Sequence, residues 1–325
     1  MLIEVTETAG SNGQVEQVCV ERPAEVGDLV FGDGIHGTGT LCEFAAVMSS
    51  QVGAVWCVCV SFRFPPVDSS TSSPLHMEPH ATTLAPCLGG RLFQCCSVSR
   101  QVVIKPKGVS MSHAAGVPLA GLTAYQCFTR HAPVQAGSKV LVLGGSGGVG
   151  SYAVQICKAL GCYVAATSSD EGLLASLGCD ETINYHEVDW GEKLKGEEYD
   201  VIFATVNDRY AGGPGGQLSA ASERALGVLK EGGVFICTLK RVMPQECPPE
   251  RNEMEYGGRS YRYFLTESTR GIDLAQMAIM MMQGKLRTVL HQDQAFPFSE
   301  EGWCEMMETS NSGRTKGKLV MKVLP

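Results

Sequence analysis

A glycine-rich turn between an apolar run and a helical pattern is the feature that most restricts the fold of this chain. Gly145, Gly147 and Gly150 fit the spacing G-x-G-x-x-G. The turn follows a short apolar run at 139–143, and apolar residues then recur at helical spacing over 149–160. In this context glycine permits a tight turn and lets the backbone approach a pyrophosphate closely. We therefore predict a dinucleotide-binding turn, with a purely structural glycine turn as the alternative.

Strand-like and helical patterns alternate through the rest of the chain, which indicates a parallel sheet covered by helices. The helix that ends at Gly284 carries Ile272, Ala275, Ile279 and Met282 on one face. Its methionines fit core packing better than a sulfur-rich ligand surface. Strands are expected at 139–143, 163–167, 200–206, 233–239, 261–265 and 318–324, and further helices at 149–160, at 219–230 and from about residue 299.

A break in composition covers about residues 48–98. This stretch is rich in Pro, Ser and Thr, has few charges and keeps neither a helical nor a strand period. A structureless stretch of this length is unusual inside a compact domain. We expect an atypical insert that is either disordered or foreign to the fold. Our hypothesis is that the sequence is a truncated and interrupted gene model, with translated intron in this segment.

Cysteine usage indicates a reducing compartment. The chain has 14 cysteines, but it is long for a disulfide scaffold, and its start resembles neither an export signal nor a transit peptide. We expect a cytoplasmic protein with reduced thiols, and an organelle stays open as an alternative if the N-terminus is truncated. Cys127, Cys157 and Cys237 stand in apolar periodic segments and are expected in the core.

Charge and hydropathy argue against two classes of partner. The formal net charge is −8, and the absence of a Lys and Arg block disfavours a nucleic-acid partner. The longest apolar stretch, 52–60, has about half the length that a membrane span needs. We therefore expect neither a nucleic-acid partner nor a membrane span.

The end of the expected strand at 163–167 bears on which dinucleotide fits. An NAD site usually offers a carboxylate there to the ribose hydroxyls. This chain offers Thr167, Ser168 and Ser169, and Asp170 comes later. Hydroxyl groups can face a 2′-phosphate without repelling it, so we favour NADP(H) as the cofactor. The alternative is that Asp170 reaches the ribose and makes the site prefer NAD(H).

A set of short segments carries a family resemblance. They are GVPLAGLTAY at 116–125, the glycine turn at 144–150, LGCD at 177–180 with INY at 183–185, GKL at 284–286, FPF at 296–298 and GK at 317–318. Together they resemble the zinc-independent quinone oxidoreductase branch of the medium-chain dehydrogenase/reductase superfamily, which includes enoyl reductase domains. RSYRYF at 259–264 is most similar to reticulon-4-interacting-protein-like members. The resemblance covers about two thirds of the chain.

The resemblance implies an α/β fold with two domains. A Rossmann domain at 113–264, with a doubly wound parallel sheet, would bind NADP. Residues 1–112 would form part of a GroES-like β-barrel domain, completed by a C-terminal return at 265–325. Family-like barrel sequence begins only at residue 26, so we expect the barrel to be incomplete. The family also implies a homodimer.

The resemblance further implies which residues contact the cofactor. Thr123 would lie near the nicotinamide ribose, and the backbone around Thr238 and Leu239 would border the nicotinamide. Many members carry a Lys shortly after the serines, where this chain has Glu171 and Gly172. The pyrophosphate would meet Ser146, Gly147, Gly148 and Val149, and the adenosine 2′-phosphate would meet Ser168, Ser169 and Tyr185.

Metal ligation finds little support in the sequence. Zinc-dependent relatives use Cys and His ligands followed by a Gly-His-Glu segment, a spacing that this sequence lacks. Five cysteines within 48–98 lack the C-x-x-C pairs typical of structural zinc, and the histidines share no ligand spacing. We therefore predict no metal site. The cysteines are Cys57, Cys59, Cys87, Cys95 and Cys96, and the histidines are His36, His113, His131, His186 and His291.

The expected activity is hydride transfer from NADPH to a quinone or an α,β-unsaturated carbonyl, without zinc. Such a reaction needs positioning more than acid–base assistance, because the cofactor carries the difficult step. We assign no catalytic residue; a proton would come from water or from a Tyr. Two rival hypotheses are an NADPH-binding sensor or interaction protein without turnover, because the barrel is incomplete, and a non-functional product whose barrel fails to fold.

Overall fold

The computed structural model describes residues 103–206, 221–267 and 270–322 and, before them, the backbone of six strands. The chain divides into two compact units. The first contains Met1–Leu119 and Ser268–Ile279, and the second contains Ala120–Glu267 and Met280–Pro325. The C-terminal return that we expected at 265–325 is thus shared between the units, with its larger part in the second.

The first unit contains a six-stranded, mostly antiparallel sheet in the order β2-β1-β6-β3-β4-β5. β1 and β6 pair in parallel, and the other neighbours are antiparallel. The strand order has two ends, β2 and β5, among the described strands. The strands are β1 (Leu2–Ala9), β2 (Val15–Arg22), β3 (Leu29–Asp33), β4 (Glu43–Met48), β5 (Val55–Cys57) and β6 (Val102–Ile104).

This sheet bears on two expectations, the start of family-like barrel sequence at residue 26 and the insert at 48–98. Strands begin at Leu2, well before the first family-like segment at residue 26. Within the expected insert at 48–98, the structure describes the backbone of β5 and the last residue of β4, and the rest lies outside the described residues. The five cysteines of the insert and His36 likewise have no described side chains.

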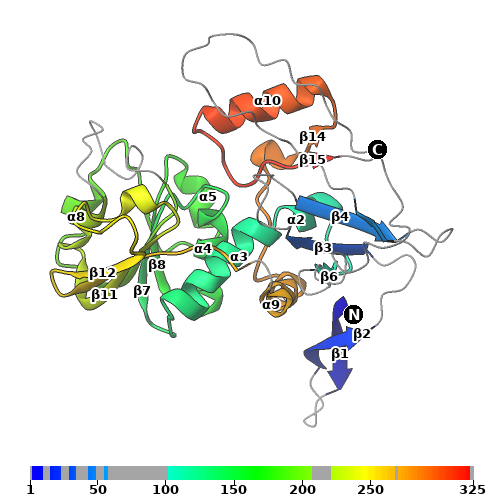
Figure 1. The fold of residues 1–325 in the computed structure, drawn as a ribbon, viewed down its shortest axis with the longest axis horizontal. Helices are drawn as coiled ribbons and strands as arrows, with labels where there is room; N and C mark the ends of the chain where they lie inside the picture. Colours follow the sequence, from blue (N-terminus) through cyan, green and yellow to red (C-terminus); the bar gives the residue numbers. More distant parts are fainter. Residues whose placement is uncertain are drawn as a thin grey trace. The chain divides into compact units, whose positions relative to one another are not determined.

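The second unit contains a seven-stranded sheet in the order β12-β13-β11-β10-β7-β8-β9, drawn in green and yellow in Figure 1. All neighbours are parallel except the edge pair β12 and β13. From β9 to β13 this is the strand order 3-2-1-4-5-6 of a Rossmann fold. The strands are β7 (Lys139–Leu143), β8 (Tyr163–Thr167), β9 (Glu181–Ile183), β10 (Tyr199–Ala204), β11 (Leu229–Cys237), β12 (Glu253–Tyr256) and β13 (Arg259–Tyr263).

Helices and short turns connect the strands. α4 packs against β7 and β8, α5 against β9, and α8 against β11. A two-stranded parallel sheet of β14 (Phe296–Pro297) and β15 (Met321–Lys322) lies near the C-terminus. The helices are α2 (Met111–Ala115), α3 (Pro118–Gln126), η2 (Cys127–His131), α4 (Gly150–Ala159), α5 (Glu171–Ser176), α6 (Trp190–Lys193), α8 (Ala221–Ala225), η3 (Lys240–Val242), α9 (Gly271–Met282), η4 (His291–Asp293) and α10 (Glu300–Asn311).

The doubly wound α/β fold predicted from the sequence is confirmed, and the strands expected at 139–143 and 163–167 match β7 and β8 residue by residue. The helix expected at 219–230 is wrong in its second half. There α8 ends at Ala225, a turn at Gly227 follows, and β11 begins at Leu229. Pairing of the chain with β10 outweighs the helical pattern, because Tyr199 and Leu229 are register partners.

Side-chain burial confirms some core assignments and corrects others. Cys127, Cys157 and Cys237 are fully buried, as expected, and so is Met277. The apolar face assigned to α9 is wrong at Ile272, which is 45% exposed. The core of the second unit contains large aromatic side chains, among them Trp190, Tyr199, Phe203, Phe235 and Tyr261.

Candidate cofactor-binding site

The expected cofactor residues of the second unit gather at one edge of its sheet. Six strands run parallel, so their carboxyl ends lie along the same edge. The glycine turn follows β7, Ser168 and Ser169 follow β8, and Tyr185 comes shortly after β9. Thr238 and Leu239 directly follow β11. In the sheet, β8 lies on one side of β7 and β10 lies on the other, so the strand order reverses direction at β7. Open α/β sheets bind ligands at such a switch point.

The first glycine of the turn is held by the neighbouring strand. Gly144 has a positive φ of 86°, and its N–H donates a 2.9 Å hydrogen bond to Thr167 Oγ1. The N–H of Gly145 donates to the carbonyl oxygen of Thr167 at 2.9 Å. A Cβ at Gly144 would lie 2.3 Å from Val206 Cγ1. Only glycine therefore fits this position, on both conformational and steric grounds.

The other glycines of the motif differ in what surrounds them. A Cβ at Gly150 would lie 2.1 Å from the carbonyl oxygen of Gly144, so this glycine permits close helix–strand packing. A Cβ at Gly145 would lie 2.7 Å from Ala166 Cβ. A Cβ at Gly147 would meet one atom within 4 Å, the Gly144 oxygen at 3.3 Å. Apart from this one close contact, the space beside Gly147 is open among the described residues, as it must be where a backbone approaches a ligand.

Backbone N–H groups at the start of α4 make this open space suitable for an anion. Within the described residues, the N–H groups of Gly148 and Val149 have no hydrogen-bond acceptor. α4 begins at Gly150 and has no side-chain cap. Free N–H groups and the positive end of a helix dipole attract phosphate. The turn thus fits the pyrophosphate of a dinucleotide.

The segment after β8 presents hydroxyl groups, one of which is already engaged. Ser168 is 1% exposed, and its Oγ accepts a 2.8 Å hydrogen bond from the N–H of Asp170. Ser169 is exposed. Tyr185 is half-buried, and its ring lies 4.3 Å from that of His186 between centroids. Ser169 and Tyr185 are therefore the accessible members of the predicted 2′-phosphate group.

Asp170, the residue that would favour NAD(H), is engaged at both carboxylate oxygens. Its Oδ1 accepts a 2.9 Å hydrogen bond from the N–H of Leu173 and caps α5. Its Oδ2 lies 2.6 Å from Lys316 Nζ. The Lys316 hydrogen bond and the Leu173 N–H lower the pKa of Asp170. Both carboxylate oxygens of Asp170 therefore have protein partners.

The residues expected near the nicotinamide lie in two places within this unit. Thr123, on α3, is 6% exposed, and its hydroxyl is hydrogen bonded to that of Thr266. Thr238 and Leu239 are half-buried at the carboxyl end of β11. Thr205, after β10, donates its hydroxyl to the carbonyl oxygen of Leu143 at 2.8 Å. This contact joins β10 to the start of the glycine turn.

The sequence reasoning missed the part that the C-terminal segment plays. The N–H of Gly317 donates a 2.7 Å hydrogen bond to the carbonyl oxygen of Ser146. A Cβ at Gly148 would lie 3.2 Å from Lys318 Cδ, so the Lys318 side chain covers one side of the turn. Gly317 and Lys318 were recognised as a family landmark, but their proximity to the turn has no signal in sequence spacing. Thr167 was expected to offer its hydroxyl to the cofactor, but its hydroxyl holds Gly144, a contact that sequence spacing does not signal either.

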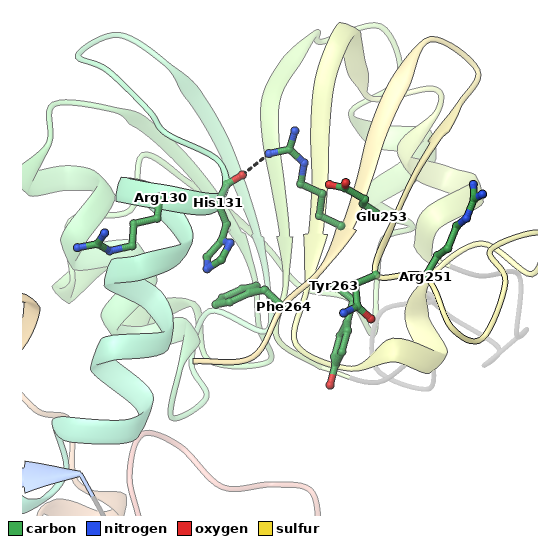
Figure 2. A pocket seen from close by; sticks show the side chains of 8 residues that line it. Arg130, His131, Arg251, Glu253, Tyr263 and Phe264 are labelled. Atoms are coloured by element: carbon green, nitrogen blue, oxygen red, sulfur yellow. Dashed lines mark hydrogen bonds between the residues drawn. The ribbon is translucent and has the colours of Figure 1, made fainter. Parts of the chain in front are cut away.

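A cavity of about 520 Å³ lies elsewhere in the same unit. Figure 2 shows Arg130, His131, Arg251 and Glu253 among its lining side chains. The guanidinium of Arg262 donates a 2.6 Å hydrogen bond to the carbonyl oxygen of His131. The His131 ring stacks on Phe264 at 4.4 Å, and burial lowers its pKa. None of the expected cofactor residues lines this cavity. The lining residues are Arg130, His131, Arg251, Asn252, Glu253, Arg262, Tyr263 and Phe264.

Within 103–206, 221–267 and 270–322, no three His, Cys, Asp or Glu side chains are grouped so that they could hold a metal ion. In this part of the chain, no helix has both the length and the apolar character needed to cross a membrane. The seven described cysteines are free thiols, and Cys304 among them is exposed.

Comparisons with known proteins agree with this architecture. The sequence profile of a family described as zinc-binding dehydrogenase matches residues 177–321. The trans-enoyl reductase pgmF of Aspergillus terreus is 30% identical over 74% of this chain and 67% of its own length. The chloroplastic NADPH-dependent alkenal/one oxidoreductase of Arabidopsis thaliana is 29% identical over 73% of this chain and 54% of its own.

The chain thus spans between about half and two thirds of the length of these curated relatives. A solved structure of the quinone oxidoreductase from Coxiella burnetii shares the fold, with a TM-score of 0.59, 20% identity and 99% coverage of both chains. The Rossmann strand order, the glycine turn at its switch point and the sequence relatives agree. The chain belongs to the quinone oxidoreductase and enoyl reductase branch of the medium-chain dehydrogenase/reductase superfamily.

Proposed function

We propose that the protein is an NADPH-dependent oxidoreductase that reduces quinones or α,β-unsaturated carbonyls by hydride transfer. The glycine turn at 144–150 carries this proposal, because the N–H groups of Gly148 and Val149 have no acceptor among the described residues and so suit a dinucleotide pyrophosphate. The substrate class is supported by relatives named trans-enoyl reductase and alkenal/one oxidoreductase. Because the chain spans only part of their length, the activity and the substrate are proposals for this chain.

The choice of NADP(H) over NAD(H) rests on the residues after β8. Ser169 is an exposed hydroxyl, and Asp170 is held by Lys316 and by the N-terminus of α5. A free carboxylate would repel a 2′-phosphate and favour a ribose diol, but this carboxylate is neutralised by an ion pair. The local charge is therefore compatible with a 2′-phosphate.

The protein's part in the reaction is to bind and orient. The bound dihydronicotinamide supplies the hydride. The N–H groups of Gly148 and Val149 would hold the pyrophosphate, while Ser168, Ser169 and Tyr185 would surround the 2′-phosphate. Thr123, Thr238 and Leu239 would fix the nicotinamide end. Positioning of this kind lowers the barrier by removing the entropy cost of bringing the reactants together.

The proposal includes no zinc ion and no assigned proton donor. The sequence lacks the Cys and His spacing and the Gly-His-Glu segment of zinc-dependent relatives. Water or a Tyr would protonate the product. Metal analysis of the purified protein, together with activity in the presence of a chelator, tests this part. Loss of turnover on chelation, with recovery on adding zinc, would contradict it.

The decisive experiment measures binding first and turnover second. NADPH and NADH are titrated against the full chain by nicotinamide fluorescence. NADPH oxidation is then followed with benzoquinone, menadione and a series of 2-alkenones. Turnover supports the enzyme, whereas tight NADPH binding without turnover supports the rival sensor function. No binding, with a near-ultraviolet circular dichroism spectrum that lacks fine structure, supports the non-functional product.

The assembly and the location of the protein stay predictions. The homodimer is implied by the family resemblance, and the cytoplasmic location is expected from cysteine usage. β12 is an edge strand with the exposed residues Glu253 and Glu255, and charged edge strands discourage further strand pairing. Light scattering of the purified chain tests the dimer, and imaging of the tagged protein tests its location.

A further inference from the structure

We propose that Lys316, from the C-terminal segment, is the residue that lets the adenosine end of the site accept a 2′-phosphate. It neutralises Asp170 and keeps N–H donors that a ligand can use. This inference rests on the proposed use of a nicotinamide dinucleotide. It concerns only how the site distinguishes NADP(H) from NAD(H).

The backbone around Lys316 is anchored on two sides. The N–H of Lys316 donates to His291 Nδ1 at 3.2 Å, and the N–H of Lys318 donates to the carbonyl oxygen of Val289 at 2.7 Å. Between them, the N–H of Gly317 donates to Ser146 on the glycine turn. These bonds fix the segment beside the turn, so the Lys316 side chain starts from a defined position.

Lys316 contacts the part of the site that discriminates the cofactors. Its Nζ lies 2.6 Å from Asp170 Oδ2, although about half of the side chain is exposed. The N–H of Asp170 is bonded to Ser168 Oγ, so the lysine ammonium and the serine hydroxyl contact the same residue. The ammonium therefore lies beside the group expected to surround a 2′-phosphate.

The count of donors and charges supports a phosphate at this place. An ammonium has three N–H donors. The carboxylate of Asp170 is the one acceptor that Lys316 Nζ has among the described residues, which leaves donors for a ligand. Without Lys316, the Asp170 carboxylate would repel a doubly charged phosphate. With it, the pair is neutral and still has hydrogen-bond donors on its exposed side.

The sequence near β8 gives an independent reason to look for a distant cation. The residues that follow Asp170 are Glu171 and Gly172, and 168–180 contain no Lys or Arg. Glu171 adds a second negative charge, and its Oε2 accepts a hydrogen bond from the Thr182 hydroxyl at 3.0 Å. The required positive charge must therefore come from another part of the chain, and Lys316 is the cation whose ion pair with this segment the structure records.

The test compares two adenosine ligands that differ only in the 2′-phosphate. The affinities of 2′,5′-ADP and 5′-AMP are measured by calorimetry on the full chain, wild type and Lys316→Ala. We expect Lys316→Ala to lower the affinity for 2′,5′-ADP by at least about tenfold, or 1.4 kcal/mol. The affinity for 5′-AMP should change by less than about twofold, because this ligand lacks the group that Lys316 meets.

Asp170→Asn distinguishes charge from structure. Asn also caps helices well, so α5 should keep its start. We expect Asp170→Asn to bind 2′,5′-ADP at least as tightly as wild type. The double variant Lys316→Ala with Asp170→Asn should recover part of the affinity lost in Lys316→Ala, because the unpaired carboxylate is gone. A purely structural role of the ion pair predicts no recovery.

Matched controls separate Lys316 from other cations. Arg314→Ala removes an exposed positive charge two residues away, and Lys285→Ala removes one after α9. Both should leave the ratio of the two affinities unchanged. The inference is overturned if Lys316→Ala binds 2′,5′-ADP like wild type, or if its affinities for 2′,5′-ADP and 5′-AMP fall equally. It is also overturned if Arg314→Ala, and not Lys316→Ala, loses affinity for 2′,5′-ADP.

The outcomes also separate this inference from the proposed function. A wild-type chain that prefers 2′,5′-ADP but reduces no quinone or enone contradicts the oxidoreductase and leaves Lys316 supported. A wild-type chain that shows no preference for the 2′-phosphate overturns the role of Lys316. NADH-dependent turnover in that case would preserve the oxidoreductase.

Discussion

The N–H of Gly317 donates a 2.7 Å hydrogen bond to the carbonyl oxygen of Ser146, which ties a segment close to the C-terminus to the glycine turn. The two residues are far apart in sequence, and the contact exists only because the chain folds back. Gly317 has a positive φ of 65°, and a Cβ there would lie 2.2 Å from the carbonyl oxygen of Val289. The position therefore requires glycine.

Gly317→Ala should displace the C-terminal segment from the turn. We expect weaker NADPH binding and a lower free energy of unfolding, by about 1–3 kcal/mol for overpacking against backbone. Fluorescence titration and urea unfolding measure the two effects. Gly313→Ala is the control for the strain of placing alanine at a positive φ, because Gly313 also has a positive φ but takes no part in the hydrogen bond to Ser146. Equal loss of NADPH affinity in both variants would contradict the role of the Gly317 contact.

Gly147→Ala and Gly150→Ala should separate binding from folding. At Gly147 the added methyl group lies 3.3 Å from the Gly144 oxygen, a milder contact than at Gly150. We therefore expect a smaller loss of stability, together with NADPH binding that is at least about tenfold weaker, a loss of 1.4 kcal/mol. At Gly150 it collides with the Gly144 oxygen, so the free energy of unfolding should fall by about 1–3 kcal/mol.

Gly172→Ala is the matched control for these two variants. It lies within α5, has an ordinary backbone conformation, and would place its Cβ 3.7 Å from Asp170 Oδ1. The substitution should stabilise the protein by roughly 0.5–1 kcal/mol. A Gly147→Ala variant that binds NADPH like wild type would exclude the expected approach of the pyrophosphate to this backbone.

Gln155→Leu should destabilise the second unit. Gln155 is 6% exposed, and its amide accepts from the N–H of Arg287 at 2.8 Å and donates to the Arg287 carbonyl oxygen at 3.0 Å. Leucine leaves both backbone groups without this partner, at a cost of about 1–3 kcal/mol. Urea unfolding measures the change, and the exposed Gln294→Leu is the control. Similar stabilities of the two variants would contradict the prediction.

Tyr261 should contribute to alkaline unfolding. Burial raises the pKa of Tyr261 to about 12, and its hydroxyl donates to the Ser222 carbonyl oxygen at 3.0 Å. Because the pKa is raised in the folded state, the stabilisation is complete below the unfolded pKa of about 10. It is lost as the pH rises through 12. Ultraviolet absorbance at the phenolate band should show late tyrosine ionisation, which Tyr261→Phe reduces; an unchanged titration would contradict this assignment.

Local sequence patterns correctly predicted the elements that depend on only a few neighbouring residues. The 139–143 and 163–167 strands and the glycine motif depend on neighbours in sequence, and all appear in the structure. β12 was missed although Gly257 and Gly258, both with positive φ, form a hairpin signal before β13. The helix expected at 219–230 was too long, because pairing with β10 decided where β11 begins.

The sequence by itself determined the family, the Rossmann fold and the glycine turn, because each depends on spacing along one stretch of chain. Only the tertiary structure decided what the carboxylate of Asp170 does. From the sequence, Asp170 could either bind the ribose of NAD(H) or leave room for the 2′-phosphate of NADP(H). In the structure, one carboxylate oxygen of Asp170 accepts from the N–H of Leu173 and the other pairs with Lys316. The physical reason is that an ion pair between residues so far apart requires the whole unit to fold and bring the C-terminal segment beside β8.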